Sequence, residues 1–144
     1  MEIKIRKLSE NAVIPSYGTE YSAGADLYAC MDEPVSIEPG ETFMVHTGVA
    51  LEIPEGYAGF VFARSGLAAK QGLAPSNKVG VIDSDYRGEI MVSIYNHSAC
   101  RRTVAPGDRI AQIVIMPYLK ADWKVCNDLE KSDRGEGGFG STGI

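Results

Sequence analysis

The sequence TFMVHTGVALEI, at residues 42–53, indicates the fold class of the chain. β-Branched, aromatic and other apolar residues dominate it, and their spacing is closer to a period of two than to the helical 3.6. Turn signals bound the run on both sides, Pro39-Gly40 before it and Pro54-Glu55-Gly56 after it. We therefore expect residues 42–53 to form a β-strand.

Similar short runs follow one another along the chain. Strands are expected at residues 2–8, 25–29, 35–37, 58–63, 80–82, 89–96 and 108–117. One short helix is expected at residues 66–71, where Gly72 can end the turn. The sequence therefore predicts an all-β chain, folded as a jelly roll or a related double sheet.

The composition predicts one compact intracellular domain. The chain has 144 residues, 44% of them hydrophobic, and a net charge of -5, which argues against a basic surface for nucleic acid or an anionic membrane. An anionic substrate would need locally placed arginines. The N-terminal MEIKIRKLSE has no continuous apolar stretch, so a cytoplasmic protein without a signal peptide is expected. The three cysteines are predicted to be buried, reduced thiols, both histidines to have structural or surface roles, and Trp123 to lie in the core or an interface.

Two acids and an aromatic residue follow the strand expected at residues 80–82, in the sequence GVIDSDYRG at residues 80–88. Taken locally, this buried-looking strand and its turn form a β-hairpin, with Asp83 and Asp85 as ordinary turn residues. The ligand spacing of an EF-hand is absent. Alternatively, a carboxylate at the strand end is a general base that holds a water in line with a phosphorus atom, and Tyr86 is a flat wall for a sugar.

A second candidate site lies where the predicted helix begins. Arg64 adds a guanidinium, and Ser65 and Gly66 add backbone N–H groups, at the positive end of the helix dipole, a position that favours phosphate. Ser65 is equally well explained as a plain N-cap. Asp26 is either a turn acid or an outer-sphere metal partner. The sequence GDRIAQ at residues 107–112 is explained by a polar turn and an apolar strand.

The last dozen residues, DRGEGGFGSTGI, cannot form a core because they contain five glycines and a single large apolar residue, Phe139, apart from the terminal residue. A dinucleotide fingerprint is excluded because no helix can follow, and a P-loop because no lysine precedes Ser141. Two alternatives remain. The segment is a frayed tail, or it is a lid in which Arg134 supplies charge and Phe139 covers a base.

Five segments in order resemble the motifs of the trimeric dUTPase family. They are AGADLYA at residues 23–29, ARSGLA at 63–68, GVIDSDYRGEI at 80–90, GDRIAQIVI at 107–115 and RGEGGFGSTG at 134–143. The resemblance implies a jelly-roll body at residues 1–133 and a C-terminal arm at 134–144. It also implies a homotrimer with active sites at subunit interfaces, each closed by the arm of a neighbouring chain.

The resemblance further implies hydrolysis of dUTP to dUMP and pyrophosphate, which limits uracil in DNA and supplies dUMP for dTMP synthesis. Asp83 would activate the water that attacks the α-phosphorus, and Tyr86 would exclude a 2'-hydroxyl. A hairpin between Asn77 and Met91 would read the uracil edge. Mg²⁺ would bind mainly phosphate oxygens, with Asp26 acting through water. The implied substrate-binding residues are Arg64, Ser65, Gly66, Asn77, Gly80, Val81, Ile82, Tyr86, Met91, Gln112, Arg134, Phe139, Gly140, Ser141 and Thr142.

Two rival functions stay open at this point. A dCTP deaminase, or a bifunctional deaminase and diphosphatase, shares the fold in the family picture, although Asp83, Tyr86 and Phe139 favour the diphosphatase. A nucleotide-responsive regulatory binding protein could keep the fold and act through partners. Measured turnover of dUTP and dCTP would separate these functions.

Overall fold

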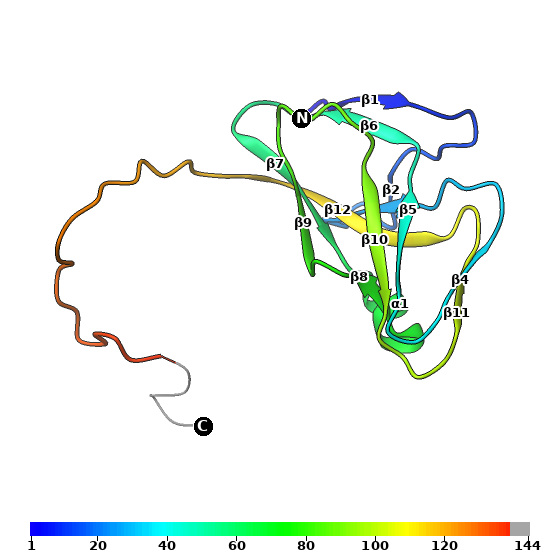
Figure 1. Ribbon diagram of the computed structural model, residues 1–144. Coiled ribbons are helices and arrows are strands. Elements are labelled where there is room, and N and C mark those ends of the chain that lie inside the picture. Colours follow the sequence, from blue (N-terminus) through cyan, green and yellow to red (C-terminus); the bar gives the residue numbers. More distant parts are fainter. Residues whose placement is uncertain (139–144) are drawn as a thin grey trace.

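The structure is a computed structural model that describes residues 1–138, and most of its regular structure is antiparallel strand (Figure 1). In chain order the elements are β1 Lys4–Lys7, β2 Ser16–Tyr17, β3 Ala25–Tyr28, β4 Val35–Ile37, β5 Thr42–His46, β6 Val49–Glu52, β7 Tyr57–Phe62, α1 Ser65–Gln71, β8 Leu73–Pro75, β9 Val79–Ile82, β10 Met91–Asn96, β11 Arg102–Val104 and β12 Arg109–Pro117. The all-β class is confirmed.

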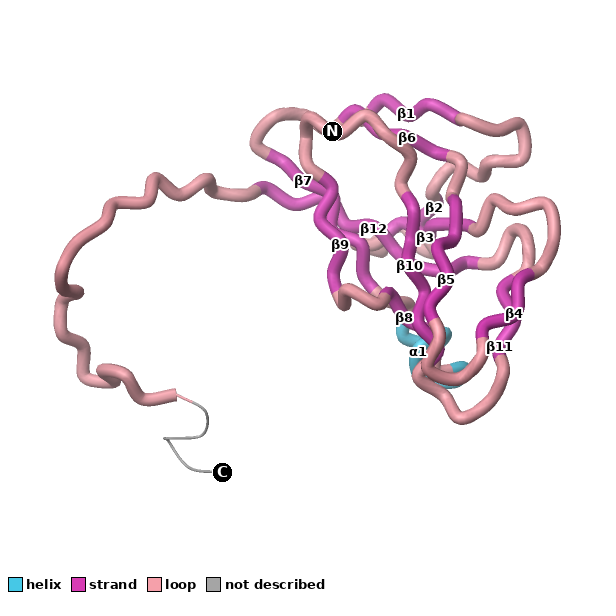
Figure 2. Tube along the Cα trace, viewed as in Figure 1, coloured by secondary structure: helices cyan, strands magenta, loops and turns pink. Residues whose placement is uncertain are grey.

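Two main sheets enclose the core. The larger sheet has the strand order β2-β3-β12-β7-β9, and the smaller has the order β5-β10-β8, while β1-β6 and β11-β4 form separate ladders. Figure 2 shows β5 and β10 crossing over β3 and β12. Apolar side chains from both sheets meet in one cluster, which includes Leu27, Val61 and Ile113 from the larger sheet and Val45 and Ile94 from the smaller. This arrangement confirms the expected jelly-roll double sheet.

The run at residues 42–53 forms two strands, β5 and β6, rather than the single expected strand. The chain turns at Thr47 and Gly48, and Gly48 has a φ of +68°, a left-handed conformation that favours glycine. A Cβ at Gly48 would also lie 2.7 Å from the Cβ of Ala12 and 2.8 Å from the Sγ of Cys30. Apolar residues on both sides of this glycine concealed the turn.

Three further strands, β2, β8 and β11, lie outside the expected runs. Each has two or three residues, which is too short to display a period of two. The expected helix is confirmed, and Gly72, with a φ of +68°, ends it by donating its N–H to the carbonyl of Ala68 at 3.0 Å. The N-cap interpretation of Ser65 is wrong, because the N-cap residue is Arg64 and Ser65 is the first helical residue.

Several expectations about burial need correction. The three cysteines are free thiols, but only Cys30 is partly buried, while Cys100 and Cys126 are exposed. Trp123 is 89% exposed, so it does not lie in the core of this subunit. Both histidines are exposed, as expected. No helix within residues 1–138 has the length and apolar character needed to cross a lipid bilayer.

Candidate active site

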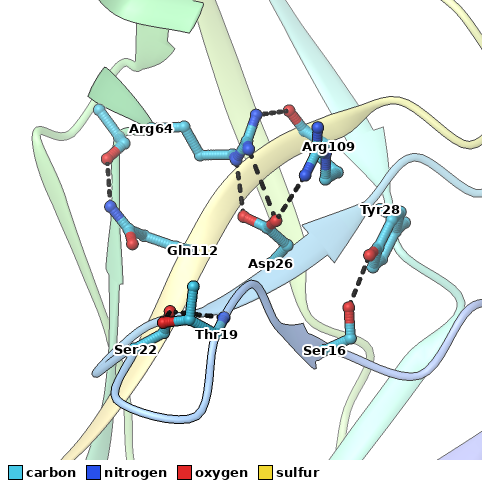
Figure 3. A network of polar contacts seen from close by, with 9 residues as sticks. Ser16, Thr19, Ser22, Asp26, Tyr28, Arg64, Arg109 and Gln112 are labelled. Atoms are coloured by element: carbon cyan, nitrogen blue, oxygen red, sulfur yellow. Dashed lines mark hydrogen bonds and ion pairs between the residues drawn. The ribbon is translucent and has the colours of Figure 1, made fainter. Parts of the chain in front are cut away.

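Arg64, which follows β7, is held by a carboxylate from β3. The Nε of Arg64 donates to Oδ1 of Asp26 at 2.6 Å, and its Nη2 lies 3.5 Å from Oδ2. The Nη1 of Arg109, on β12, lies 3.4 Å from the same Oδ2 (Figure 3). Asp26 is 9% exposed, and burial of a charge is costly unless it is paired. Asp26 is therefore a buried anion that orients two guanidinium groups, and its interpretation as a turn acid is wrong.

Gln112 fixes the backbone beside Arg64. Its Nε2 donates to the carbonyl of Ala63 at 2.9 Å (Figure 3), and the pairing of β12 with β3 places it opposite Asp26. A Cβ at Gly24 would lie 2.4 Å from its Oε1, so glycine is needed for Gln112 to lie there. The residues from the first, second and fourth motifs thus meet in one place.

These side chains surround a surface pocket of ≈ 420 Å³. Arg64, Gln112 and Arg109 line it, and Ser65 and Gly66 are exposed at its edge. A pocket with two guanidiniums, a carboxamide and a hydroxyl offers hydrogen-bond donors to an anion, phosphate in particular. Three of the four predicted phosphate-binding residues, Arg64, Ser65 and Gly66, are consecutive, and the pairing of the strands brings the fourth, Gln112 on β12, into the same pocket.

Arg109 belongs to this site, although the sequence had not singled it out. It lies next to the polar turn in GDRIAQ, and a charged residue at a polar turn needs no functional explanation. The register of β12 against β3, with a shift between Arg109 and Ala111, brings its guanidinium to Asp26. The only available signal was its place within the fourth motif, since 83 residues separate it from Asp26.

Asp83 lies in the connection between β9 and β10, and this connection is not a β-hairpin. β9 pairs with β7 in the larger sheet, whereas β10 pairs with β5 and β8 in the smaller sheet. The local hairpin interpretation is therefore wrong, because the strands on either side of the turn bond to other partners. The connection is ordered by its own contacts, among them Tyr86 N–H to the carbonyl of Asp83 at 3.2 Å and Tyr86 O–H to the carbonyl of Glu89 at 3.0 Å.

The strand before Asp83 is less buried than its sequence suggests. Val81 is 58% exposed, because side chains alternate along β9 and Val81 lies on the opposite face from Ile82, which is partly buried against the core. A Cβ at Gly80 would lie 3.3 Å from Val61 and 3.5 Å from the Nδ2 of Asn77, so the strand passes close to both. Asn77 is exposed in the turn between β8 and β9, and Met91, at the start of β10, is 43% exposed.

Within one subunit, Asp83 and Arg64 do not meet. β9 runs antiparallel to β7, with Val79 opposite Phe62 and Ile82 opposite Gly59, so Asp83 continues away from the end of β7 that leads to Arg64. Six residues along β7 correspond to about 20 Å. Asp83 lines a different groove, of ≈ 980 Å³, together with Asp85 and Trp123. The predicted base and the predicted phosphate site are thus at separate places on the subunit.

The C-terminal part of the predicted site is described only as far as Gly138. After β12 the chain leaves the body in extended form (Figure 1), and the Nε of Arg134 donates to the carbonyl of Gly137 at 2.6 Å. The predicted residues Phe139, Gly140, Ser141 and Thr142 lie outside the described residues.

The donor set fits a cation that is held mainly by substrate oxygens. Within residues 1–138, no three histidine, cysteine, aspartate or glutamate side chains are grouped to hold a metal ion. Oδ2 of Asp26 lies 3.5 Å from Nη2 of Arg64 and 3.4 Å from Nη1 of Arg109, and Asp26 is one of the residues that line the pocket. Mg²⁺ commonly keeps several waters and binds through substrate phosphates.

Comparison with known proteins supplies the family. A family model described as dUTPase matches residues 10–143. The chain belongs to the dUTPase family. The matched region includes all five dUTPase motifs, which confirms the resemblance seen in the sequence.

Relatives and solved structures of dUTPases agree over nearly the whole chain. The deoxyuridine 5'-triphosphate nucleotidohydrolase of Idiomarina loihiensis is 47% identical over 146 residues, covering 99% of this chain and 97% of that protein. The protein of the same name from Burkholderia ambifaria is 46% identical, and the match again covers 99% of this chain and 97% of that protein. A mutant dUTPase of Staphylococcus bacteriophage 80alpha, solved with dUpNHpp, is 30% identical, covers 99% of each chain and has a TM-score of 0.90. A mutant dUTPase from phage phi11 of S. aureus, described with a structural Mg(II) ion, is 29% identical, covers 91% of this chain and all of that one, and has a TM-score of 0.81.

Proposed function

We propose that this member of the dUTPase family hydrolyses dUTP to dUMP and pyrophosphate at sites between subunits of a homotrimer. Its relatives are named deoxyuridine 5'-triphosphate nucleotidohydrolases, and the 80alpha dUTPase was solved with dUpNHpp. The observation that carries the proposal is the pocket in which Asp26 aligns Arg64 and Arg109 beside Gln112. Such a pocket suits a polyphosphate.

The phosphates would bind at this pocket. Arg64 can offer N–H groups that Asp26 leaves free, and the exposed Ser65 and Gly66 can add a hydroxyl and backbone N–H groups. Gln112 would support the chain while holding the carbonyl of Ala63. Mg²⁺, held by triphosphate oxygens and waters with Asp26 in the outer shell, would supply neutralisation of phosphate charge.

Asp83 would act as general base for the attacking water at the α-phosphorus. Its carboxylate is exposed at the end of β9 and is free to face a substrate. Because Arg64 of the same subunit lies toward the other end of β7, we infer that the two residues act together across a subunit interface. A site of this kind is complete only in the oligomer.

The uracil and the deoxyribose would bind next to Asp83. Main-chain groups of Gly80, Val81, Ile82 and Met91 and the side chain of Asn77 would read the uracil edge, where cytosine would leave a buried polar mismatch. Tyr86 is held by its bond to the carbonyl of Glu89, and its ring would collide with a 2'-hydroxyl.

The exposed apolar side chains of the segment after β12 support the proposal that the C-terminal arm reaches a neighbouring subunit. Leu119, Val125 and Leu129 are each more than 80% exposed in the subunit, as is Trp123. Apolar exposure of this extent marks an interaction surface. A neighbouring subunit would cover these side chains and so direct the arm at 134–144 to a second active site, where Arg134, Ser141 and Thr142 reach phosphates and Phe139 with Gly140 covers uracil.

Pyrophosphate release measured with dUTP, dCTP, dTTP and UTP tests this function directly. We expect turnover with dUTP and little with the other three nucleotides. Ammonia released from dCTP would establish the deaminase instead. Absence of turnover, with nucleotide binding retained, would favour a regulatory binding protein. The cytoplasmic location expected from the sequence stays a prediction.

A further inference from the structure

The connection that carries Asp83 and Tyr86 spans two sheets, so strand pairing alone does not determine its position. β9 ends at Ile82 in the larger sheet, and β10 begins at Met91 in the smaller sheet. The residues between them must be held by other contacts if the base and the sugar wall are to keep their places.

Those contacts converge on Glu89. Its Oε1 accepts a hydrogen bond from the N–H of Gly48 at 2.7 Å. Its Oε2 accepts one from Nδ1 of His46 at 2.8 Å, with the histidine as donor because a carboxylate has no proton to give. Its backbone carbonyl accepts the O–H of Tyr86 at 3.0 Å. One residue therefore links the turn between β5 and β6 to the aromatic ring of the proposed site.

The next residue continues the same attachment. Ile90 is buried, and its N–H donates to the carbonyl of Val49 at 2.9 Å. The hydroxyl of Thr47, also buried, donates to the carbonyl of Ile90 at 2.5 Å. Buried hydrogen bonds of this kind restrict backbone movement because breaking them leaves a polar group without water.

Two glycines make this geometry accessible. Gly48 adopts a φ of +68° and turns its N–H toward the Glu89 carboxylate. At Gly88, a Cβ would lie 2.4 Å from the hydroxyl oxygen of Tyr86, so a side chain there would displace the tyrosine. The turn and the connection are thus shaped to fit one another.

We propose that Glu89 is a positioning residue, which anchors the Asp83–Tyr86 connection to the turn at residues 46–49 and so sets the position of the base and the sugar wall. The kinetic part of this proposal rests on the proposed function. The anchoring itself rests only on the contacts described above. Glu89 touches neither substrate nor reacting atoms in this assignment.

The test compares Glu89→Ala with Glu89→Gln and with the control Glu38→Ala. Glu89→Ala removes both side-chain contacts. Glu89→Gln can restore both, because the amide oxygen accepts from Gly48 and the amide nitrogen donates to a neutral histidine. Glu38 pairs with Arg101 at the surface, and its loss serves as the control for removing a hydrogen-bonded carboxylate.

We expect Glu89→Ala to lower kcat for dUTP by about 10²-fold, as a displacement of roughly 1 Å can do, and to reduce the preference for dUTP over UTP. KM should change less, because the phosphate pocket lies elsewhere. Glu89→Gln should restore both values, and Glu38→Ala should leave both unchanged. Unchanged kcat and unchanged preference in folded Glu89→Ala, relative to the control, would overturn the proposal.

Amide hydrogen exchange provides a measurement that is independent of activity. Without nucleotide, residues 83–88 should exchange faster in Glu89→Ala than in the wild type and in Glu38→Ala. If Glu89→Ala does not fold, Thr47→Val, which removes only the bond to Ile90, should show the same local increase. Unchanged exchange would overturn the anchoring. If residues 83–88 exchange faster in Glu89→Ala but the wild-type protein does not turn over dUTP, the anchoring is supported and the proposed function is refuted.

Discussion

Asp26 and Arg64, which are 38 residues apart, form a partly buried ion pair with Nε 2.6 Å from Oδ1. Because the carboxylate fixes the guanidinium before any ligand binds, part of the ordering cost of phosphate binding is already met by the fold. The same carboxylate also holds Arg109.

Replacing Asp26 with asparagine should therefore weaken both stability and catalysis. We expect unfolding free energy to fall by roughly 1–3 kcal/mol, because the mostly buried carboxylate is lost to Arg64, which is partly buried, and to Arg109, which is half exposed. kcat/KM for dUTP should fall as well, since Arg64 would lose its orientation. Urea unfolding and steady-state kinetics measure the two effects. The matched control, Glu38→Gln at an exposed arginine pair, should change stability by no more than about 0.5 kcal/mol.

Asp83→Asn should separate binding from chemistry. The carboxamide keeps the size of the side chain but cannot take the proton of the attacking water, so turnover should fall by about 10²–10⁴-fold. The trimer and dUTP affinity should be retained, as measured by light scattering and calorimetry. Near-normal turnover would remove Asp83 from the role of base.

Tyr86→Ala should admit UTP. Removing the ring removes the steric barrier to a 2'-hydroxyl, and the dUTP-over-UTP ratio of kcat/KM should fall at least about tenfold. Tyr86→Phe is the comparison, because it keeps the ring and loses the bond to Glu89, and so separates the steric effect of the ring from the anchoring of the tyrosine. An unchanged ratio in the alanine variant would mean that another group enforces the preference.

Deleting residues 134–144 should leave a folded trimer that hydrolyses dUTP poorly. A glycine-rich segment adds little to a core, so thermal stability without nucleotide should hardly change. Turnover should fall because phosphate charge, the uracil stack and water exclusion are lost together. Phe139→Trp, as the comparison, should retain activity and report nucleotide binding by fluorescence. A truncated protein with full activity would show that the segment is only a tail.

Glu89 should make the protein sensitive to acid. Burial raises the pKa of Glu89, but its interactions with His46 and Gly48 outweigh burial and hold the pKa below its ordinary value of 4.5. A depressed pKa contributes stability above pH 4.5, and this contribution is lost as pH falls through the lower folded value. Wild-type unfolding free energy should therefore fall below pH 4.5 more steeply than that of Glu89→Gln. Parallel curves for the two proteins would contradict this assignment.

The sequence by itself determined the features that depend on local chemistry. Alternating apolar residues were enough for most strands, and good helix formers followed by Gly72 were enough for α1, because strand period and left-handed glycine are properties of a few neighbouring residues. The five ordered motifs were enough for the family, and the match to residues 10–143 confirmed it. The roles of individual residues such as Asp83 stay predictions that the experiments above test.

Only the tertiary structure decided which distant residues meet. Asp26 and Arg109 are 83 residues apart, and their contact depends on the register of β12 against β3. Pairing across the sheets also decided the partners of β9 and β10, which excluded the local hairpin. It likewise decided the turn at Gly48, which divided one expected strand into two. The separation of Arg64 from Asp83 comes from the antiparallel direction of β9 beside β7. Strand partners are chosen by burial of the whole core, and no local stretch of sequence contains that information.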